Sequence, residues 1–162
     1  MSVIDETIEL WEQEPEKAAV APRVVARFDG DGGVTLESGP FTWQTDLPPP
    51  LGGGNAAASP TAQLLGALAG CAVVFITDTL APQLDIQIDS VSATASCKAD
   101  FRGLLGMGGV APDLGDLALA IEISSPDSAD QVDELYRVWL ERCPVYLALT
   151  KPTSINTTLS AS

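Results

Sequence analysis

Apolar residues at helical spacing predict three helices, the first of them close to the N-terminus. Ile4, Ile8 and Trp11 share one face of a stretch in which half of the other residues are acidic. This pattern indicates an amphipathic helix over residues 2–14, with Ser2 as the N-cap of a capping box. We expect it to be an arm that packs on its own domain or on a second copy of the chain. Docking to another protein is the alternative.

The second predicted helix is apolar nearly all round its circumference. Ser59 is the expected N-cap, and Pro60 takes the first helical position, where its missing N–H costs nothing. The helix is predicted to extend to about Leu80. Its unbroken apolar run, Leu64–Ile76, has thirteen residues, which is too short to cross a bilayer and suits a buried helix. We therefore expect this helix at the centre of the fold.

The third predicted helix opens at Ser125-Pro126-Asp127 and carries a regular apolar stripe. Pro144 interrupts it, because a proline removes one backbone hydrogen bond and forces a kink or a restart. Residues 145–149 then continue the helical pattern. The stripe consists of Val132, Leu135, Tyr136, Trp139 and Cys143.

Alternating apolar and polar residues predict the strands. The segment 29–33, Asp-Gly-Asp-Gly-Gly, is interpreted as a hairpin turn, since it lacks the later bidentate acid of a calcium loop. Together the elements predict an α+β fold with mainly antiparallel sheets. The predicted strands are residues 23–28, 34–37 and 41–45, which form a β-meander, followed by 85–99, 117–125 and 154–159.

Length and composition fit a single globular domain, with 162 residues of which 46% are hydrophobic. We assign residues 1–21 to the acidic helical arm and residues 22–162 to the domain. The first residues have neither the basic region nor the apolar stretch of a secretion signal. We therefore expect a cytoplasmic protein, in a compartment that keeps thiols reduced.

The charge and the missing residue types exclude several classes of function. A net charge of -14 disfavours nucleic acid and anionic membranes as partners. The chain contains no histidine, which removes histidine-based triads and metal sites. Cys71, Cys97 and Cys143 form no CxxC pair, so we expect neither a metal nor a bound cofactor.

Cys143 is the cysteine whose position by itself suggests chemistry. Because a helix restarts at Pro144, its thiol is expected near free N–H groups and the positive end of the helix dipole, which lower a thiol pKa. Arg137 and Arg142 are near enough in sequence to add to this effect. The alternative for Cys143, as for Cys71 inside its apolar helix, is a packing role, which is common for buried cysteines.

Two motifs together resemble a known protein family. The segment Ser59–Cys71, SPTAQLLGALAGC, is similar to the helix motif of the OsmC/Ohr family, roughly SPxELLLAALxxC. The segment Glu141–Val145, ERCPV, is similar to the family's second motif, xxCPV. Shorter likenesses lie at residues 101–106 and 123–126, so the resemblance covers about residues 22–160.

This resemblance implies an intertwined homodimer, with sheets wrapped around two long central helices and each site between the subunits. It implies that Cys71 is the peroxidatic thiol and Cys143 the resolving thiol in the reduction of organic hydroperoxides. Cys71 would form a sulfenic acid, and Cys143 would condense with it to a disulfide. A small dithiol such as dihydrolipoamide would then restore both thiols.

The chain departs from the family at two positions. Characterised members carry a glutamate just after the motif's proline, where Thr61, Ala62 and Gln63 stand here, and an arginine that poises the thiolate. The candidates to replace that arginine are Arg27 and Arg102. These departures support a second hypothesis, in which the fold is a non-catalytic dimeric binding protein for a small apolar ligand or a protein partner.

Overall fold

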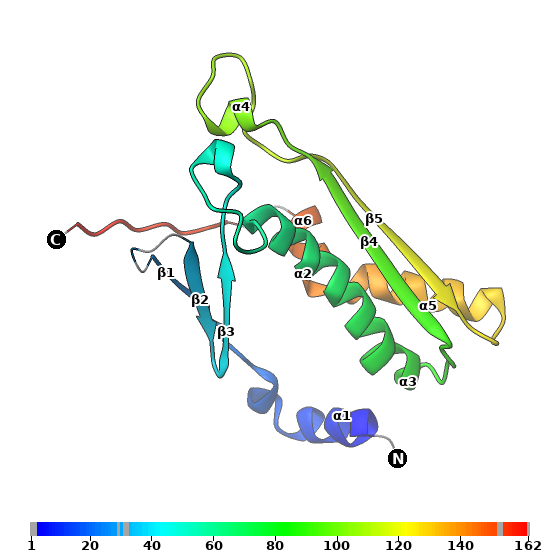
Figure 1. Ribbon diagram of the computed structural model, residues 1–162. Coiled ribbons are helices and arrows are strands. Elements are labelled where there is room, and N and C mark those ends of the chain that lie inside the picture. The colour runs from blue at the N-terminus through cyan, green and yellow to red at the C-terminus, as the bar shows by residue number, and fades with distance from the viewer. Residues whose placement is uncertain (1–2, 29, 31–32, 152–153, 162) are drawn as a thin grey trace.

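The computed structural model describes residues 3–28, 30, 33–151 and 154–161 of the chain (Figure 1). Its main helices and strands follow the predicted order as far as residue 150, with two antiparallel sheets and two main helical segments. The elements are α1 (Val3–Gln13), β1 (Val25–Phe28), β2 (Val34–Ser38), β3 (Phe41–Thr45), α2 (Pro60–Val74), α3 (Ala81–Gln83), β4 (Ser90–Lys98), α4 (Phe101–Leu104), β5 (Gly115–Ser124), α5 (Ala129–Arg142) and α6 (Pro144–Thr150). The predicted α+β class is confirmed.

The first sheet is the predicted β-meander, in the order β1-β2-β3. Val34 pairs with Phe28 on one side and with Thr45 on the other, so three short strands share one register. The first strand begins at Val25, later than predicted. Most of the predicted turn at 29–33 lies outside the described residues.

The second sheet is a long hairpin of β4 and β5, and its β4 strand confirms the alternation read from the sequence. Along β4, half-buried apolar residues alternate with exposed Ser92, Thr94 and Ser96. Ala93 lies opposite Ile121, and the apolar face of the hairpin packs against the central helices. The strand begins at Ser90 rather than at residue 85, because residues 85–89 form the connection from the preceding helix.

The central helical segment begins at the predicted cap and ends slightly beyond its predicted end at about Leu80. Ser59 caps it as predicted, its Oγ accepting a hydrogen bond from the N–H of Ala62. After α2 the chain continues through a π-helical stretch, Phe75–Leu80, into α3, making one helix of 24 residues. By length and composition alone this helix is long enough to cross a membrane, a test that core helices of soluble proteins also pass. The expectation that this helix is too short to cross a bilayer, which was based on its thirteen-residue apolar run, is therefore wrong.

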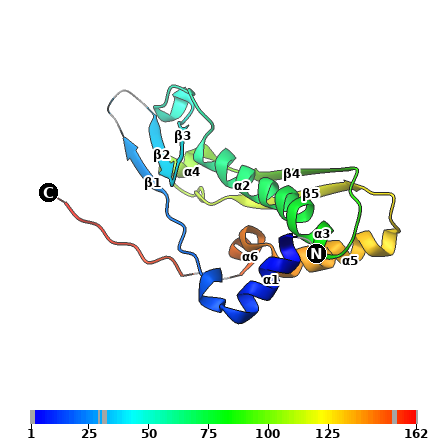
Figure 2. The same cartoon turned by 90° about the horizontal axis from the view of Figure 1, so that it is seen from below.

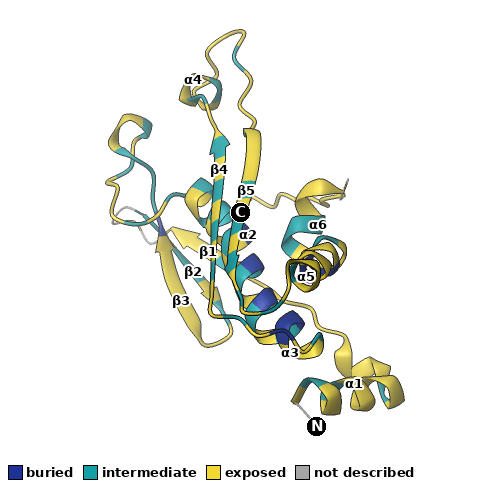
Figure 3. Ribbon diagram, turned by 90° about the vertical axis from the view of Figure 1, so that its right-hand side faces the viewer, coloured by how far each residue is buried: buried dark blue, intermediate teal, exposed yellow. Residues whose placement is uncertain are grey.

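The core forms where this long helix meets α5. Ala72, Ile76 and Leu80 are buried against Leu135 and other residues of α5. Figure 3 shows the buried positions concentrated on the facing sides of α2, α3 and α5. This contact is the predicted packing of two central helices.

The start of α5 differs from the prediction. Ser128 is its N-cap and forms a capping box with Gln131, whereas Ser125-Pro126-Asp127 was expected to open the helix. Ser125 and Asp127 instead bind the backbone of Gln87, which ties the start of the helix to the loop before β4. Because both side chains are hydrogen-bonded to the backbone of Gln87, they do not cap the helix.

The predicted strand at residues 154–159 is wrong. Residues 154–161 form no strand, and in Figure 1 this segment extends away from the body of the protein. Ile155 and Leu159 are 84% and 96% exposed. Strand propensity alone does not make a strand, because the backbone needs a neighbouring chain segment for its ladder.

The N-terminal helix α1 was predicted as an amphipathic arm. None of its described residues is buried, and it lies beside α3 at one end of the molecule (Figure 2). Ser2, the predicted N-cap, lies outside the described residues. The division into an arm of residues 1–21 and a domain of residues 22–162 stays a prediction.

The contact between the long helix and α5 predicts a large cost for truncation of Leu135, which is fully buried. We expect Leu135→Ala to lower the free energy of unfolding by about 2–5 kcal/mol, through lost burial and the cavity left behind. Urea denaturation at one fixed protein concentration measures this change. Leu105→Ala, at an exposed position, is the matched control and should stay within about 0.5 kcal/mol of wild type. Equal losses in the two variants would contradict the proposed core.

Candidate active site

The two cysteines of the paired motifs lie side by side in the folded chain. Cys71 is on α2, and Cys143 lies between α5 and α6. Their sulfurs are 3.4 Å apart, with the Cys143 thiol donating to the Cys71 sulfur. Both thiols are free. A disulfide bond is about 2.05 Å long, so a small movement would join them.

Backbone geometry at the end of α5 sets the position of Cys143. Its N–H still bonds to the carbonyl of Trp139, which completes the last turn of α5. Pro144 then opens α6, as predicted, because a proline suits the first position of a helix. This junction holds the sulfur inside the core, where Cys143 is fully buried.

The two thiols differ in accessibility. Cys71 is only half-buried, whereas Cys143 is shielded from solvent. A reagent entering from solvent would therefore meet the Cys71 sulfur first. Cys97, the third cysteine, is half-buried on β4 and lines a separate hollow together with Asp100 and Asp113.

Burial raises the pKa of the Cys71 thiol above its ordinary value, and the hydrogen bond with Cys143 raises it further. The N–H of Val145 at the start of α6 acts in the opposite direction, because it donates to the Cys71 sulfur. From the sequence, the free N–H groups of this helix start were expected to lie at the Cys143 thiol. That expectation is wrong, because Cys143 makes no side-chain cap and its thiol contacts Cys71.

Both arginines proposed to poise the thiolate are bound to carboxylates elsewhere. Arg27 on β1 pairs with Glu37 on β2. Arg102 lies on α4, near the tip of the β4–β5 hairpin (Figure 1), and pairs with Asp100 at 2.6 Å. The hydrogen bonds from Arg102 lower the pKa of Asp100 to about 2, so this pair is ionised at neutral pH.

The arginines near Cys143 in sequence are also engaged. Arg137 pairs with Glu134 and Glu141 along α5. Arg142 donates to the side chain of Gln83 at the end of α3. Each bond holds a guanidinium on the outer surface of the helices.

Gln63, one of the residues that stand where the resemblance led us to expect an acid, has a role that was not recognised from the sequence. Its side-chain oxygen accepts from Trp43 Nε1 at 3.1 Å, and its nitrogen donates to the carbonyl of Gln44 at 2.7 Å. Thr45 adds a hydrogen bond to the carbonyl of Ala58 at 2.8 Å. These bonds fasten the start of α2 to strand β3, and so help to position the helix that carries Cys71.

Asp46 organises the loop that leads into α2, and this too was not recognised from the sequence. Its carboxylate accepts from the backbone N–H groups of Ala56, Leu47 and Gly54, which together lower its pKa. At Gly53 a Cβ atom would lie 1.9 Å from the carbonyl oxygen of Leu47, so the loop closes only with glycine there. In the sequence, the signal that could have revealed this loop was an acid followed by a run of glycines.

Comparison with known proteins places this arrangement in a family. A family model described as OsmC-like protein matches residues 52–158, which is more than half of the chain and includes both cysteines. The chain belongs to the OsmC family. A search of curated proteins found no match.

Solved structures share the fold of this OsmC family member. An OsmC-like protein from Mycoplasma pneumoniae is 24% identical, with a TM-score of 0.67, covering 80% of this chain and 87% of that one. An organic hydroperoxide resistance protein OsmC from Legionella pneumophila is 22% identical, with a TM-score of 0.58, covering 81% and 90%. The organic hydroperoxide resistance protein OhrB of Bacillus subtilis is 18% identical, with a TM-score of 0.53, covering 81% and 91%.

The raised pKa of Cys71 predicts an unusual pH dependence for its alkylation. Only the thiolate reacts with iodoacetamide, so the rate at Cys71 should keep rising through roughly pH 8.5, where an ordinary thiol is half ionised. Mass spectrometry of the Cys71 peptide after timed alkylation measures the rate. A synthetic peptide of the same sequence is the control and should level off at lower pH. A plateau for Cys71 below that of the peptide would refute a raised pKa.

Proposed function

We propose that this OsmC family protein reduces organic hydroperoxides with Cys71 and Cys143. The observation that carries the proposal is the 3.4 Å separation of the two sulfurs. Structural neighbours with the same fold are described as organic hydroperoxide resistance proteins, which supports the substrate class. The apolar surroundings of the pair also suit an organic peroxide better than hydrogen peroxide.

Cys71 acts first because it is the more accessible thiol. Its thiolate attacks the distal oxygen of the peroxide, the O–O bond breaks, and the leaving alkoxide takes up a proton as the alcohol. The sulfur is thereby oxidised to sulfenic acid. Cys143 then attacks this sulfur, forming the Cys71–Cys143 disulfide and releasing water. The two thiols supply both electrons, so the scheme uses no metal and no bound cofactor.

A small dithiol such as dihydrolipoamide closes the cycle. It exchanges with the Cys71–Cys143 disulfide through a mixed disulfide, leaves as its own cyclic disulfide and restores both thiols. A reducing compartment keeps the pair ready for the next peroxide, which is consistent with our assignment to the cytoplasm. The N–H of Val145 supports the thiolate at Cys71 in place of the family's arginine.

We further propose that the working unit is a homodimer. The chain exposes 11516 Å² of surface for a mass of 16.8 kDa, whereas a compact monomer of that mass exposes about 7,600 Å². Large apolar side chains contribute to the excess, including Val74, which is 57% exposed on the central helix α2. Apolar surface of this extent requires a cover, and a second copy supplies one by symmetry.

A non-catalytic binding protein is the second candidate. It is favoured by the raised pKa of Cys71 and by the pairing of Arg27 and Arg102 with carboxylates away from the thiols. The two candidates differ in the redox behaviour of the pair. A binding protein has no need for Cys71 and Cys143 to be linked on oxidation.

The peroxidase proposal predicts cysteine-specific effects on cumene hydroperoxide consumption with dihydrolipoamide. Cys71→Ser should reduce turnover to the uncatalysed background, because the attacking sulfur is lost. Cys143→Ser should form no disulfide within the chain and should turn over more slowly than wild type, at the rate at which dihydrolipoamide itself reduces the Cys71 sulfenic acid. Cys97→Ser is the matched control and should turn over like wild type. Wild-type activity equal to the Cys71→Ser background would favour the binding protein.

The dimer proposal predicts a mass of about twice 16.8 kDa in solution. Size-exclusion chromatography with light scattering, repeated over a dilution series, measures it. The mass should hold on dilution, because interfaces of several thousand Å² are commonly obligate. A single-chain mass at micromolar concentration would remove the proposal.

A further inference from the structure

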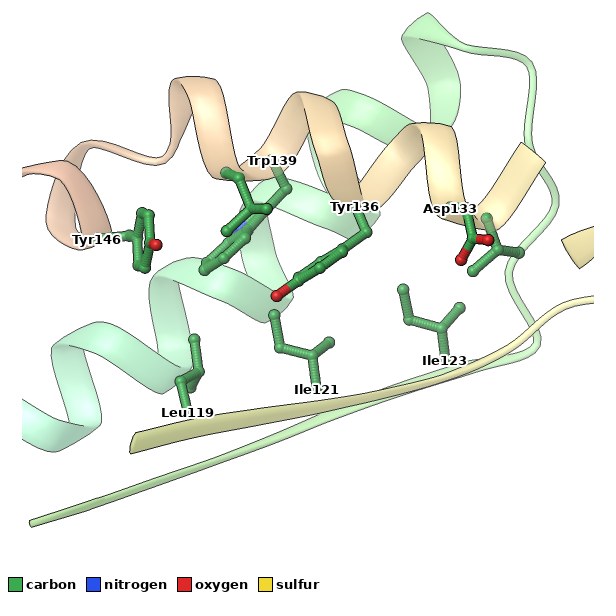
Figure 4. Close-up of a pocket in the computed structure, with 9 residues that line it drawn as sticks. Leu119, Ile121, Ile123, Asp133, Tyr136, Trp139 and Tyr146 are labelled. Atoms are coloured by element: carbon green, nitrogen blue, oxygen red, sulfur yellow. The ribbon is translucent and has the colours of Figure 1, made fainter. Parts of the chain in front are cut away.

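A groove between β5 and α5 has features that the proposed peroxidase chemistry does not use. It encloses about 480 Å³, the size of a small-molecule site. One wall is aliphatic and comes from alternate residues of β5, namely Leu119, Ile121 and Ile123. The opposite wall comes from α5 and α6 (Figure 4).

The helical wall is a row of aromatic rings. Tyr136 stacks on Trp139 with ring centroids 6.0 Å apart and planes 8° apart. Tyr146 continues the row at 5.1 Å from Trp139, with its ring tilted by 46°. Trp139 is buried, whereas Tyr136 is 45% exposed at the mouth of the groove. Tyr136 and the half-buried Tyr146 therefore offer ring surface to a ligand, while the buried Trp139 packs between them.

A single carboxylate stands at one end of this row. In Figure 4, Asp133 projects from α5 toward the groove, next to Ile123 and on the side of Tyr136 away from Trp139. Within the part of the chain that the structure describes, Asp133 has no ion-pair or hydrogen-bond partner. None of the nine lining residues is basic. The neighbouring acid on the helix, Glu134, is already paired with Arg137.

We infer that the groove binds an organic cation with an apolar body, such as an alkylammonium ion. The ammonium group lies between the Asp133 carboxylate and the ring face of Tyr136, where ion pairing and cation–π attraction act together. The alkyl part extends between the aromatic row and the aliphatic residues of β5. This goes beyond the peroxidase proposal, because neither Cys71 nor Cys143 lines the groove.

Charge decides between this ligand and a second copy of the chain as the occupant. Another copy carries its own net charge of -14. A second copy that covered the groove would remove water from the unpaired Asp133 carboxylate, and it would bring few cations to pair with that carboxylate. An organic cation supplies the missing charge and also fills the apolar part.

Calorimetric titration of the full chain with octyltrimethylammonium, below its micelle concentration and at 0.15 M salt, tests the inference. We expect one ion bound per chain, about tenfold more tightly than octanoate or 1-octanol. Asp133→Asn should weaken binding of the cation about three- to tenfold. Asp130→Asn, an equal charge change on the same helix outside the groove, is the matched control and should bind like wild type.

Three results would overturn the inference. The first is equal affinity for the cation and the neutral alcohol. The second is an equal loss in the Asp133 and Asp130 variants, which would mean attraction to overall charge alone. The third is no binding at all, and a monomeric Tyr136→Arg variant would then assign the groove to contact between copies. Cys71→Ser should bind the cation unchanged, so failure of the peroxidase proposal is seen separately.

Discussion

The packing of the long central helix against α5 is the contact on which the rest of the structure depends. Ala72, Ile76 and Leu80 meet α5 in the buried core, and the same contact brings Cys71 within 3.4 Å of Cys143. The core and the candidate active site are therefore one feature. Because interiors are tightly packed, a change that loosens the helices also separates the sulfurs.

This shared origin creates a chemical conflict. The burial that stabilises the fold also raises the pKa of Cys71, while the peroxidatic role that we propose for this thiol requires its ionised form. One backbone N–H, from Val145, opposes that effect. It reaches Cys71 because Pro144 restarts the chain as a helix directly after Cys143. A backbone donor, rather than a charged side chain, therefore opposes the effect of burial on the pKa of Cys71.

Within the described residues, the surface of the single chain has two features without a partner: exposed apolar side chains and an unpaired carboxylate. Exposed apolar side chains on the central helix and an area well above that of a compact monomer fit a second copy. The groove beside α5 has an aromatic wall but also the unpaired Asp133, which fits a cation. Charge therefore separates the surface that we propose for self-association from the site that we propose for a ligand, although the two lie on one small domain.

Local patterns in the sequence by themselves determined the elements and the pair of motifs. The alternation over β4, the Ser59 cap, the apolar stripe of α5 and the break at Pro144 all depend on neighbours within a few residues. Only the tertiary structure decided how Ser125 and Arg27 are used, because their partners Gln87 and Glu37 lie on other segments of the chain. The same holds for residues 154–159, whose strand-forming sequence finds no neighbouring strand in the described chain. The distance between Cys71 and Cys143 was likewise decided by helix packing, since spacing along a chain does not define spacing in space.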